Sequence, residues 1–478
     1  MGVRPRMTGD RCFGNMTPMP ARRSVVLAVI LALGAVAVPG SPDPAAAATT
    51  TSLGQRYEIA ATLDVTSGRL DAVEEITLTN ESTRTIDHVN LSVVPRALGY
   101  LEMSDTVTVD GEPVLGAWTT TINLRVPLEG LDGGESVVIG LSFALNVGSS
   151  PDAFSARLSR DAGVLSFGQW FPILSTEHEV YGLGDPQISF TADAIRLDLT
   201  TTTPLPRDAV ACPGLVSAPE STGSEWVCEV EEVRDFSFIV NPAFALTTRT
   251  VGDTTLRVYT QTVDGSATAD LATAALIGLS EAFGPYPWPD LVLAEVGAGG
   301  GFSMEYPRAI HLTRGKVVDT YVVYHEVAHQ WFYAQLGNDQ QREPWLDEGF
   351  ADFSARYLMG IGPDQCSTRP IDSPVFAWEA GPTTGGDWGS CDGYFHTVFY
   401  RGTEFLNAIR GAMGDEAFFA AMRDWVAANR HGMTTARGLL LHLDGSTDAD
   451  LRPIFRAYLA DLDTTLRKPP ETLPKAGG

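Results

Sequence analysis

Residues 325–329 carry the motif H-E-x-x-H, in which two histidines lie four positions apart. On a helix, positions i and i+4 share one face, so the imidazoles of His325 and His329 can reach one metal ion. Neutral imidazole suits Zn²⁺, and two nitrogen ligands leave positions for a carboxylate and a water molecule. Glu326 adjoins the first histidine and is placed to act as a base. The motif predicts a catalytic metal site, although a lone match also occurs on ordinary exposed helix faces.

A second motif, W-L-D-E-G-F-A at residues 345–351, supplies a candidate third ligand. Its glutamate, Glu348, is separated from His329 by eighteen residues. A helix, a loop and a second antiparallel helix would return Glu348 to the two histidines. A zinc site built on cysteines is not expected, because the chain contains no C-x-x-C pattern.

The N-terminal half of the chain has the pattern of β-strands. From residue 54 to about residue 255, apolar and polar side chains alternate with a period of two, as in residues 57–65. The segment is rich in Thr and Val, and helical periodicity is hard to find. Such alternation is typical of strands with one buried face. We expect an N-terminal all-β domain, a sandwich or saddle, over residues 52–255.

Helical spacing dominates the chain after residue 258. Short strands are expected at residues 290–296 and 309–312, which would form a small sheet. Helices are expected at residues 267–283, 320–336, 346–359, 398–411, 416–428, 435–442 and 449–462. A mainly helical domain is thus predicted over residues 256–467, followed by a flexible tail at residues 468–478. The predicted fold class is α+β with more than one domain.

These motifs together resemble the M1 family of gluzincin metallopeptidases, the thermolysin-like aminopeptidases. The shared features are H-E-x-x-H, the eighteen-residue spacing, and Glu348 within W-L-x-E-G-F-A. Residues 302–307 (FSMEYP) also resemble the family's G-x-M-E-N/Y motif, at the usual separation before the zinc helix. The likeness covers most of the chain and is most specific from Glu305 to Asp352. It implies that the helical domain is a thermolysin-like zinc peptidase domain.

The resemblance also implies an activity, that of a zinc-dependent aminopeptidase acting on peptide substrates. His325, His329 and Glu348 would bind one Zn²⁺ ion. Glu326 would act as the general base, taking a proton from the attacking water and delivering it to the leaving amine. Glu305 would meet the free α-amino group of the peptide as a carboxylate, which would place the first peptide bond at the metal.

Two further polar residues have possible roles beside this set. Asp352 lies one helical turn after Glu348. It could accept a hydrogen bond from a ligand histidine, or it could belong to a solvated helix face. Gln169 sits where the family's β domain directs a polar residue toward the N-terminus of the substrate.

Three features depart from the family pattern. Phe302 stands where the family has a small residue, and its side chain could narrow the approach of the substrate backbone. Phe399 occupies the place of an oxyanion-stabilising tyrosine in a Y-x-[KR]-G motif, which Tyr400 or Tyr394 could replace. Only 130 residues follow Glu348, so the cleft would be more open than in relatives with a large C-terminal domain. A catalytically weak or silent zinc-bound protein, or an endopeptidase with an open cleft, are therefore alternative interpretations.

The N-terminus has the pattern of a secretory signal. Arg22 and Arg23 precede an apolar run at residues 24–38, and alanines at residues 45–48 offer a cleavage site. We expect a signal peptide over residues 1–47 and a secreted or cell-envelope protein without a stable membrane anchor. The alternative, an uncleaved membrane anchor, would need a longer apolar run.

Cysteine content and charge agree with export. Four cysteines follow the predicted signal, and an even number in an exported chain suggests two disulfides. The pairs Cys212–Cys228 and Cys366–Cys391 close the shortest loops among three possible connectivities. The formal net charge of −26 argues against nucleic acid as a partner.

Overall fold

The fold is described from a computed structural model. It describes residues 53–149, 157–175, 189–297, 302–363, 365–372, 390–391, 393–460, 462 and 466. The predicted signal peptide at residues 1–47 and the predicted tail at residues 468–478 lie outside these residues. Within them, no helix combines the length and apolar character needed to cross a membrane.

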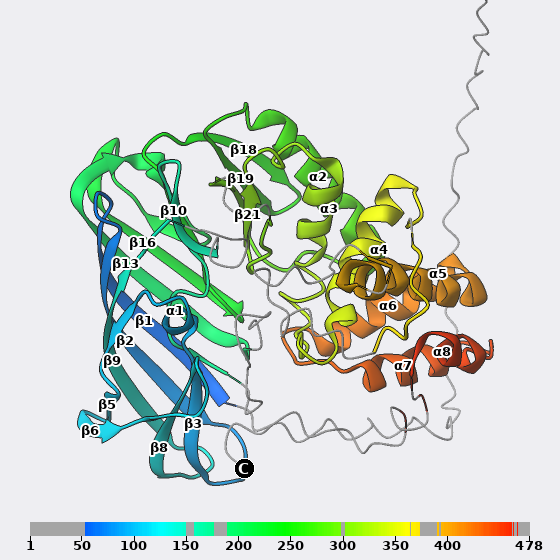
Figure 1. Ribbon diagram of the computed structural model, residues 1–478, viewed down its shortest axis with the longest axis horizontal. Helices are drawn as coiled ribbons and strands as arrows, with labels where there is room; N and C mark the ends of the chain where they lie inside the picture. The colour runs from blue at the N-terminus through cyan, green and yellow to red at the C-terminus, as the bar shows by residue number, and fades with distance from the viewer. Residues whose placement is uncertain are drawn as a thin grey trace, which may run out of the picture. The chain divides into compact units, whose positions relative to one another are not determined.

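The N-terminal region is built on one long sheet, drawn in blue to green in Figure 1. Its described strands follow the order β15-β16-β13-β1-β2-β9-β5-β6, and β4 also pairs with β9. Most neighbours are antiparallel, but β1 and β13 are parallel. The strands are β1 (Leu53–Asp64), β2 (Arg69–Asn80), β4 (Leu101–Met103), β5 (Thr106–Val109), β6 (Glu112–Leu115), β9 (Ser136–Asn146), β13 (Ala192–Pro206), β15 (Leu215–Ser217) and β16 (Thr222–Val233).

Two smaller sheets, ordered β12-β3-β8-β7 and β10-β11-β17-β14, share one hydrophobic core with the long sheet. The alternation predicted for residues 57–65 is observed, because Tyr57, Ile59, Ala61 and Leu63 all point into this core. The elements are β3 (Ile86–Ser92), α1 (Val94–Ala97), β7 (Ala117–Trp118), β8 (Asn123–Leu131), β10 (Leu158–Asp161), β11 (Val164–Phe167), β12 (Ile173–Leu174), η2 (Arg207–Ala209), β14 (Val210–Ala211) and β17 (Phe238–Val240).

A separate small sheet follows, with the order β18-β19-β20-β21. The predicted strand at residues 290–296 is β20 (Asp290–Val296), and that at residues 309–312 is β21 (Ala309–Thr313). Both are fully buried and pair in parallel. The hairpin of β18 (Ala245–Val251) and β19 (Thr254–Thr260) completes this sheet. The predicted domain boundary after residue 255 therefore falls inside β19.

Helices make up most of the remaining chain, and they are coloured green to red in Figure 1. The helix α2 spans Ser266–Phe283 with Gly284 as its C-cap, so the predicted end at residue 283 is observed. The others are α3 (Thr320–Ala328), η3 (Pro344–Leu346), α4 (Glu348–Met359), η5 (Phe395–Tyr400, a π-helix), α5 (Arg401–Met413), α6 (Asp415–Asn429), α7 (Ala436–Gly445) and α8 (Arg452–Tyr458). The predicted fold class is confirmed: an N-terminal β region precedes a mainly helical region with a small sheet.

Two helices are much shorter than predicted. The helix expected over residues 449–462 is observed as α8 over Arg452–Tyr458, and it ends where Leu459 turns extended. The helix expected over residues 320–336 ends as α3 at Ala328, with His329 as its C-cap. The chain then forms turns in which Ala334 N–H donates to the carbonyl of His329. Tyr333 has a φ of 125°, which no helix accommodates. Apolar spacing continues through these turns because their side chains are buried too, so periodicity alone could not mark the end of the helix.

Candidate metal centre

The short helix α3 carries the two histidines on its buried side. Asp319 caps its N-terminus by accepting a hydrogen bond from Val322 N–H, at 3.3 Å. His325 and His329 are 7% and 1% exposed. Their Nε2 atoms lie 3.1 Å apart, so the predicted i, i+4 arrangement brings both imidazoles to one point.

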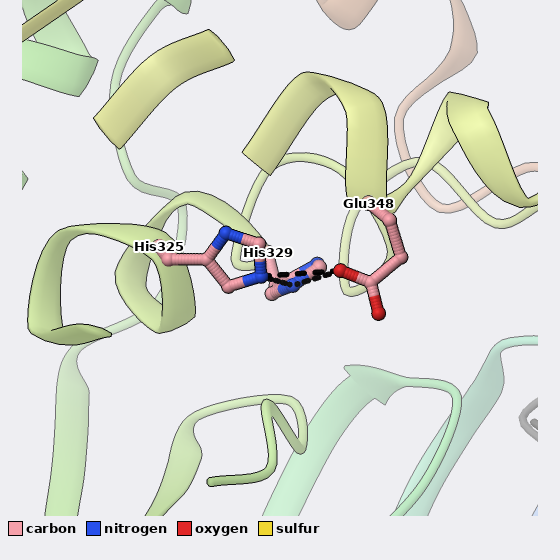
Figure 2. Close-up of side chains that lie close together, drawn as sticks. All are labelled: His325, His329 and Glu348. Atoms are coloured by element: carbon pink, nitrogen blue, oxygen red, sulfur yellow. Dashed lines mark hydrogen bonds and ion pairs between the residues drawn. The ribbon is translucent and has the colours of Figure 1, made fainter. Parts of the chain in front are cut away.

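Glu348 is the first residue of α4 and reaches the same point. Figure 2 shows its carboxylate directed at the two imidazoles. Its Oε2 atom lies 3.1 Å from Nε2 of His325 and 3.5 Å from Nε2 of His329. Burial raises the pKa of Glu348, but hydrogen bonds from the two histidines outweigh burial and lower it to about 2. The carboxylate is therefore ionised at neutral pH, as a metal ligand must be.

The three donor atoms fit a tetrahedral metal ion. Zinc bonds of about 2.0–2.1 Å would separate two tetrahedral ligand atoms by roughly 3.3–3.4 Å. The separations among His325, His329 and Glu348 are 3.1–3.5 Å. The facing Nε2 atoms of His325 and His329 each carry a lone pair when unprotonated, and without a metal only a single proton shared between them could form a hydrogen bond. A cation bound by all three donors satisfies them together, which favours a metal site.

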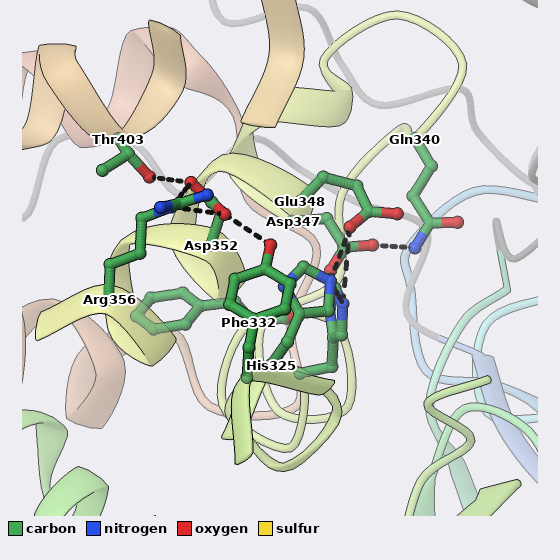
Figure 3. A network of polar contacts seen from close by, with 10 residues as sticks. His325, Phe332, Gln340, Asp347, Glu348, Asp352, Arg356 and Thr403 are labelled. Carbon is green, nitrogen blue, oxygen red and sulfur yellow. Dashed lines mark hydrogen bonds and ion pairs between the residues drawn. The ribbon is translucent and has the colours of Figure 1, made fainter. Parts of the chain in front are cut away.

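A second carboxylate orients His329 from behind. Oδ1 of Asp347 lies 2.5 Å from Nδ1 of His329, and the side-chain amide of Gln340 donates to the other oxygen of Asp347. Figure 3 shows the contact between Gln340 and Asp347. An acceptor at Nδ1 leaves the Nε2 lone pair free for a metal. Asp347 is not among the residues predicted from the sequence, although its place beside Glu348 in W-L-D-E-G is a usable signal.

Asp352 has neither of its two expected roles, the histidine acceptor and the solvated helix face. Asp352 is fully buried, so it does not belong to a solvated helix face. Its carboxylate accepts hydrogen bonds from Tyr321 at 2.5 Å, Arg356 at 2.9 Å and Thr403 at 2.6 Å (Figure 3). The histidine acceptor is Asp347, because that residue immediately precedes α4 and contacts His329, whereas Asp352 lies between Tyr321 of α3 and Thr403 of α5.

Two more carboxylates lie beside the histidines. Ligand atoms of Glu305, Glu326 and His329 all lie within 4.8 Å of one another. Glu305 is held next to β21 because Met304 N–H donates to the carbonyl of His311, and His311 N–H donates back. Burial raises the pKa of Glu326 to about 7, against the opposing charges of the two histidines. A carboxyl group with such a pKa can both accept and release a proton near neutral pH.

Aromatic rings cover one side of the centre. The ring of Phe399 stacks on that of His325, with centroids 5.5 Å apart and planes 5° apart. Tyr400 instead lies against Arg356, whose guanidinium carbon is 4.8 Å from the ring centroid. Tyr394 is buried, 5.7 Å from the Phe399 ring. Of the two tyrosines considered as replacements, Tyr394 therefore lies on the side of Phe399 and Tyr400 does not.

Phe302 and Gln169 lie on the segments expected near the substrate. The Phe302 ring is 38% exposed and packs beside Phe395, with centroids 6.3 Å apart. Gln169 is buried with a φ of 51°, and its side-chain oxygen accepts a hydrogen bond from Arg157. The preceding residue, Gly168, packs so closely on Tyr306 that any side chain there would clash with the ring.

No protein-family model matches the chain. Among solved structures, it is similar to an M1 zinc metallopeptidase from Deinococcus radiodurans, with 18% identity and a TM-score of 0.62 over 89% of this chain and 96% of that one. A glutamate-to-alanine mutant from that organism, bound to a Tyr-Ser-Ala substrate, matches with the same values. A two-domain M1 zinc metallopeptidase mutant bound to L-tryptophan matches with 17% identity and a TM-score of 0.63, over 88% and 96% of the two chains. These likenesses confirm the resemblance at the level of the fold.

Proposed function

We propose that this chain, which has the two-domain fold of the M1 zinc metallopeptidases, is a zinc-dependent aminopeptidase that hydrolyses the first bond of peptides. The observation that carries the proposal is the convergence of three metal-binding donors from His325, His329 and Glu348 beside two further carboxylates. Two acids next to one metal site can divide proton transfer and amine binding between them. The Tyr-Ser-Ala substrate of the similar Deinococcus radiodurans mutant supports a peptide substrate class.

The chemistry would be shared between the metal and Glu326. A zinc ion held by His325, His329 and Glu348 would lower the pKa of a water molecule and polarise the peptide carbonyl. Glu326 takes the proton of the attacking water on its carboxylate and passes it to the leaving amine.

Glu305 would select the N-terminus of the substrate. A buried carboxylate attracts an α-ammonium group strongly, because a charge-assisted hydrogen bond gains strength where water is excluded. Glu305 is 5% exposed and lies within 4.8 Å of the Glu326 and His329 ligand atoms. An amine bound at Glu305 would therefore lie close to the metal centre, as the carbonyl of the first residue requires. Removal of single N-terminal residues follows.

We also propose that the protein is exported from the cytoplasm. The structure contains the two disulfides expected from the sequence, Cys212–Cys228 and Cys366–Cys391. Disulfides persist in oxidising compartments, and residues 1–47 have the pattern of a cleaved signal. Fusion of residues 1–47 to a reporter that folds only after export tests this directly. Retention of the reporter inside the cell contradicts it.

A catalytically silent zinc-bound protein is the second candidate, favoured by one observation. The ring that stacks on His325 belongs to Phe399, which has no hydroxyl to donate to an oxyanion. Loss of one such donor costs about a hundredfold or more in rate. A protein of this kind would bind zinc and peptides without hydrolysing them.

One experiment separates the candidates. Purified protein is analysed for metal and then assayed on an unblocked peptide and on its N-acetylated form. The aminopeptidase predicts about one zinc per chain and release of the first residue from the unblocked peptide alone. Equal cleavage of both peptides indicates an endopeptidase. Full zinc occupancy without any hydrolysis indicates the silent protein.

A further inference from the structure

The turn that carries Glu305 is buried and strained. Glu305, Tyr306 and Arg308 are 5%, 0% and 4% exposed. Arg308 has a φ of 62°, which is uncommon for a residue with a side chain. Such a conformation persists only where the surroundings hold it, and it recurs at functional sites.

Gln330 holds this turn from the metal-binding segment. Its side-chain amide donates to the carbonyl of Glu305 at 3.3 Å and to that of Tyr306 at 3.2 Å. Its side-chain oxygen accepts the backbone N–H of Arg308 at 2.8 Å. The residue is 0% exposed, so no water competes for these groups. One side chain therefore satisfies three backbone groups of residues 305–308.

The place of Gln330 in the chain makes this contact specific. It directly follows His329, one of the three metal-binding donors, so the turn and the donor share one rigid connection. A second support acts on the far end of the turn, where Nε of Arg308 donates to Asp290 in β20 at 2.9 Å. Asp290 fixes the turn to the sheet, and Gln330 fixes it to the metal centre.

We propose that Gln330 is a positioning residue that sets the distance between the amine-binding carboxylate of Glu305 and the metal centre. The inference rests on the proposed aminopeptidase function and adds the residue that determines its exopeptidase specificity. Glu305 can select a free N-terminus only if its carboxylate stays at one fixed distance from the reacting carbonyl. A displacement of about 1 Å is enough to lose much of the benefit of such positioning.

Gln335 provides a matched control. It is also a glutamine with 0% exposure in the turns after α3. Its side-chain amide donates to the backbone carbonyl of Gln330 at 3.1 Å. Gln330→Met and Gln335→Met therefore remove the same chemical group from the same buried segment, but only the first releases residues 305–308. Gln330→Glu is a second variant, which keeps the shape and the acceptor for Arg308 N–H and loses both donors.

The test measures binding in the zinc-loaded Glu326→Ala background, so that no turnover is needed. The affinities of an unblocked tripeptide and its N-acetylated form are measured by calorimetry, together with zinc content. In the parent we expect tighter binding of the unblocked form. We expect Gln330→Met and Gln330→Glu to reduce that preference by roughly tenfold with zinc retained, and Gln335→Met to keep it. With Glu326 restored, the Gln330 variants should raise KM for the unblocked peptide more than they lower kcat.

The outcomes distinguish the inference from the function on which it rests. The positioning role is overturned if the Gln330 and Gln335 variants show the same preference for the unblocked over the N-acetylated peptide. It is also overturned if the Gln330 and Gln335 variants alike lose zinc. The aminopeptidase proposal stands in either case. A parent that binds both peptides equally overturns amine recognition by Glu305, and the role of Gln330 falls with it.

Discussion

Nδ1 of His329 lies 2.5 Å from the carboxylate of Asp347, while Nε2 of the same ring faces His325 and Glu348. The imidazole is thus fixed at both nitrogens, by an acceptor on one side and by the metal-binding donors on the other. Because Asp347 is 1% exposed and also bound by Gln340, the ring cannot turn without breaking buried contacts. This relationship indicates that Asp347 orients His329, and it predicts that Asp347 would strengthen the binding of a metal ion.

Removal of Asp347 should weaken zinc binding. We expect Asp347→Ala to lower zinc affinity by about 10–100-fold, and Asp347→Asn by less, because the amide oxygen can still accept from Nδ1. Competition with a chelator of known affinity measures both values. Asp352→Asn is the control, since that buried carboxylate bonds Tyr321, Arg356 and Thr403 but no histidine. Equal losses in all three variants would show a general packing effect.

Glu326 should be needed for turnover but not for metal binding. We expect Glu326→Gln to lower kcat by about 10²–10⁴-fold, the usual contribution of a general base, with zinc content unchanged. His329→Ala should instead lose the metal, because it removes one of three donors. Steady-state kinetics and metal analysis of the same preparations separate the two roles. Wild-type kcat in Glu326→Gln would contradict the assignment.

A tyrosine at position 399 would supply the hydroxyl group that Phe399 lacks. If no hydroxyl serves the oxyanion, Phe399→Tyr should raise kcat by about tenfold or more, because a new donor would lie beside His325. If Tyr394 already serves, Phe399→Tyr should change little and Tyr394→Phe should lower kcat. Tyr400→Phe is the control, since its ring lies against Arg356. An effect of Tyr400→Phe alone would contradict the geometry.

Glu74 should make stability depend on pH. It is fully buried in β2, neither carboxylate oxygen has a hydrogen-bond partner among the described residues, and burial raises its pKa well above the ordinary value. A raised pKa in the folded state means that the protonated form is favoured there. The contribution of Glu74 to the stability of the folded protein is complete below its pKa in the unfolded chain, about 4.3. That contribution declines as pH rises toward its pKa in the folded protein.

Glu74→Gln removes this dependence. The free energy of unfolding of the variant should match that of the wild type near pH 4. Above that pH the variant should become more stable than the wild type, by up to about 1.4 kcal/mol per pH unit until the pKa of Glu74 in the folded protein is reached. Urea unfolding of both proteins at pH 4.5, 6 and 7.5 measures the difference. Because Glu75 is on the exposed face of the same strand, Glu75→Gln is the matched control. A difference that stays constant with pH would contradict the buried carboxyl.

Much of the architecture is readable from local patterns. The strand at residues 290–296 is a short, mostly apolar run with a glycine-rich exit, and it is observed at those bounds. The helix α2 has apolar spacing and is followed by a glycine. Its predicted range, residues 267–283, differs from the observed range by one residue at the start. Burial of one face leaves a periodic pattern in the sequence and burial of both faces leaves an apolar run, so such elements are predictable without tertiary information.

The three donors of the metal centre are predictable from local patterns, because H-E-x-x-H places two imidazoles on one helical face and the spacing to Glu348 allows one return of the chain. The residues that support these donors are set by contacts that form only in the folded chain. Asp347 and Asp352 are near-neighbours on either side of Glu348, and the start of α4 directs one to His329 and the other to Arg356. The end of α3 and the contact of Gln330 with residues 305–308 likewise depend on packing between distant segments, which leaves no periodic signal in the chain.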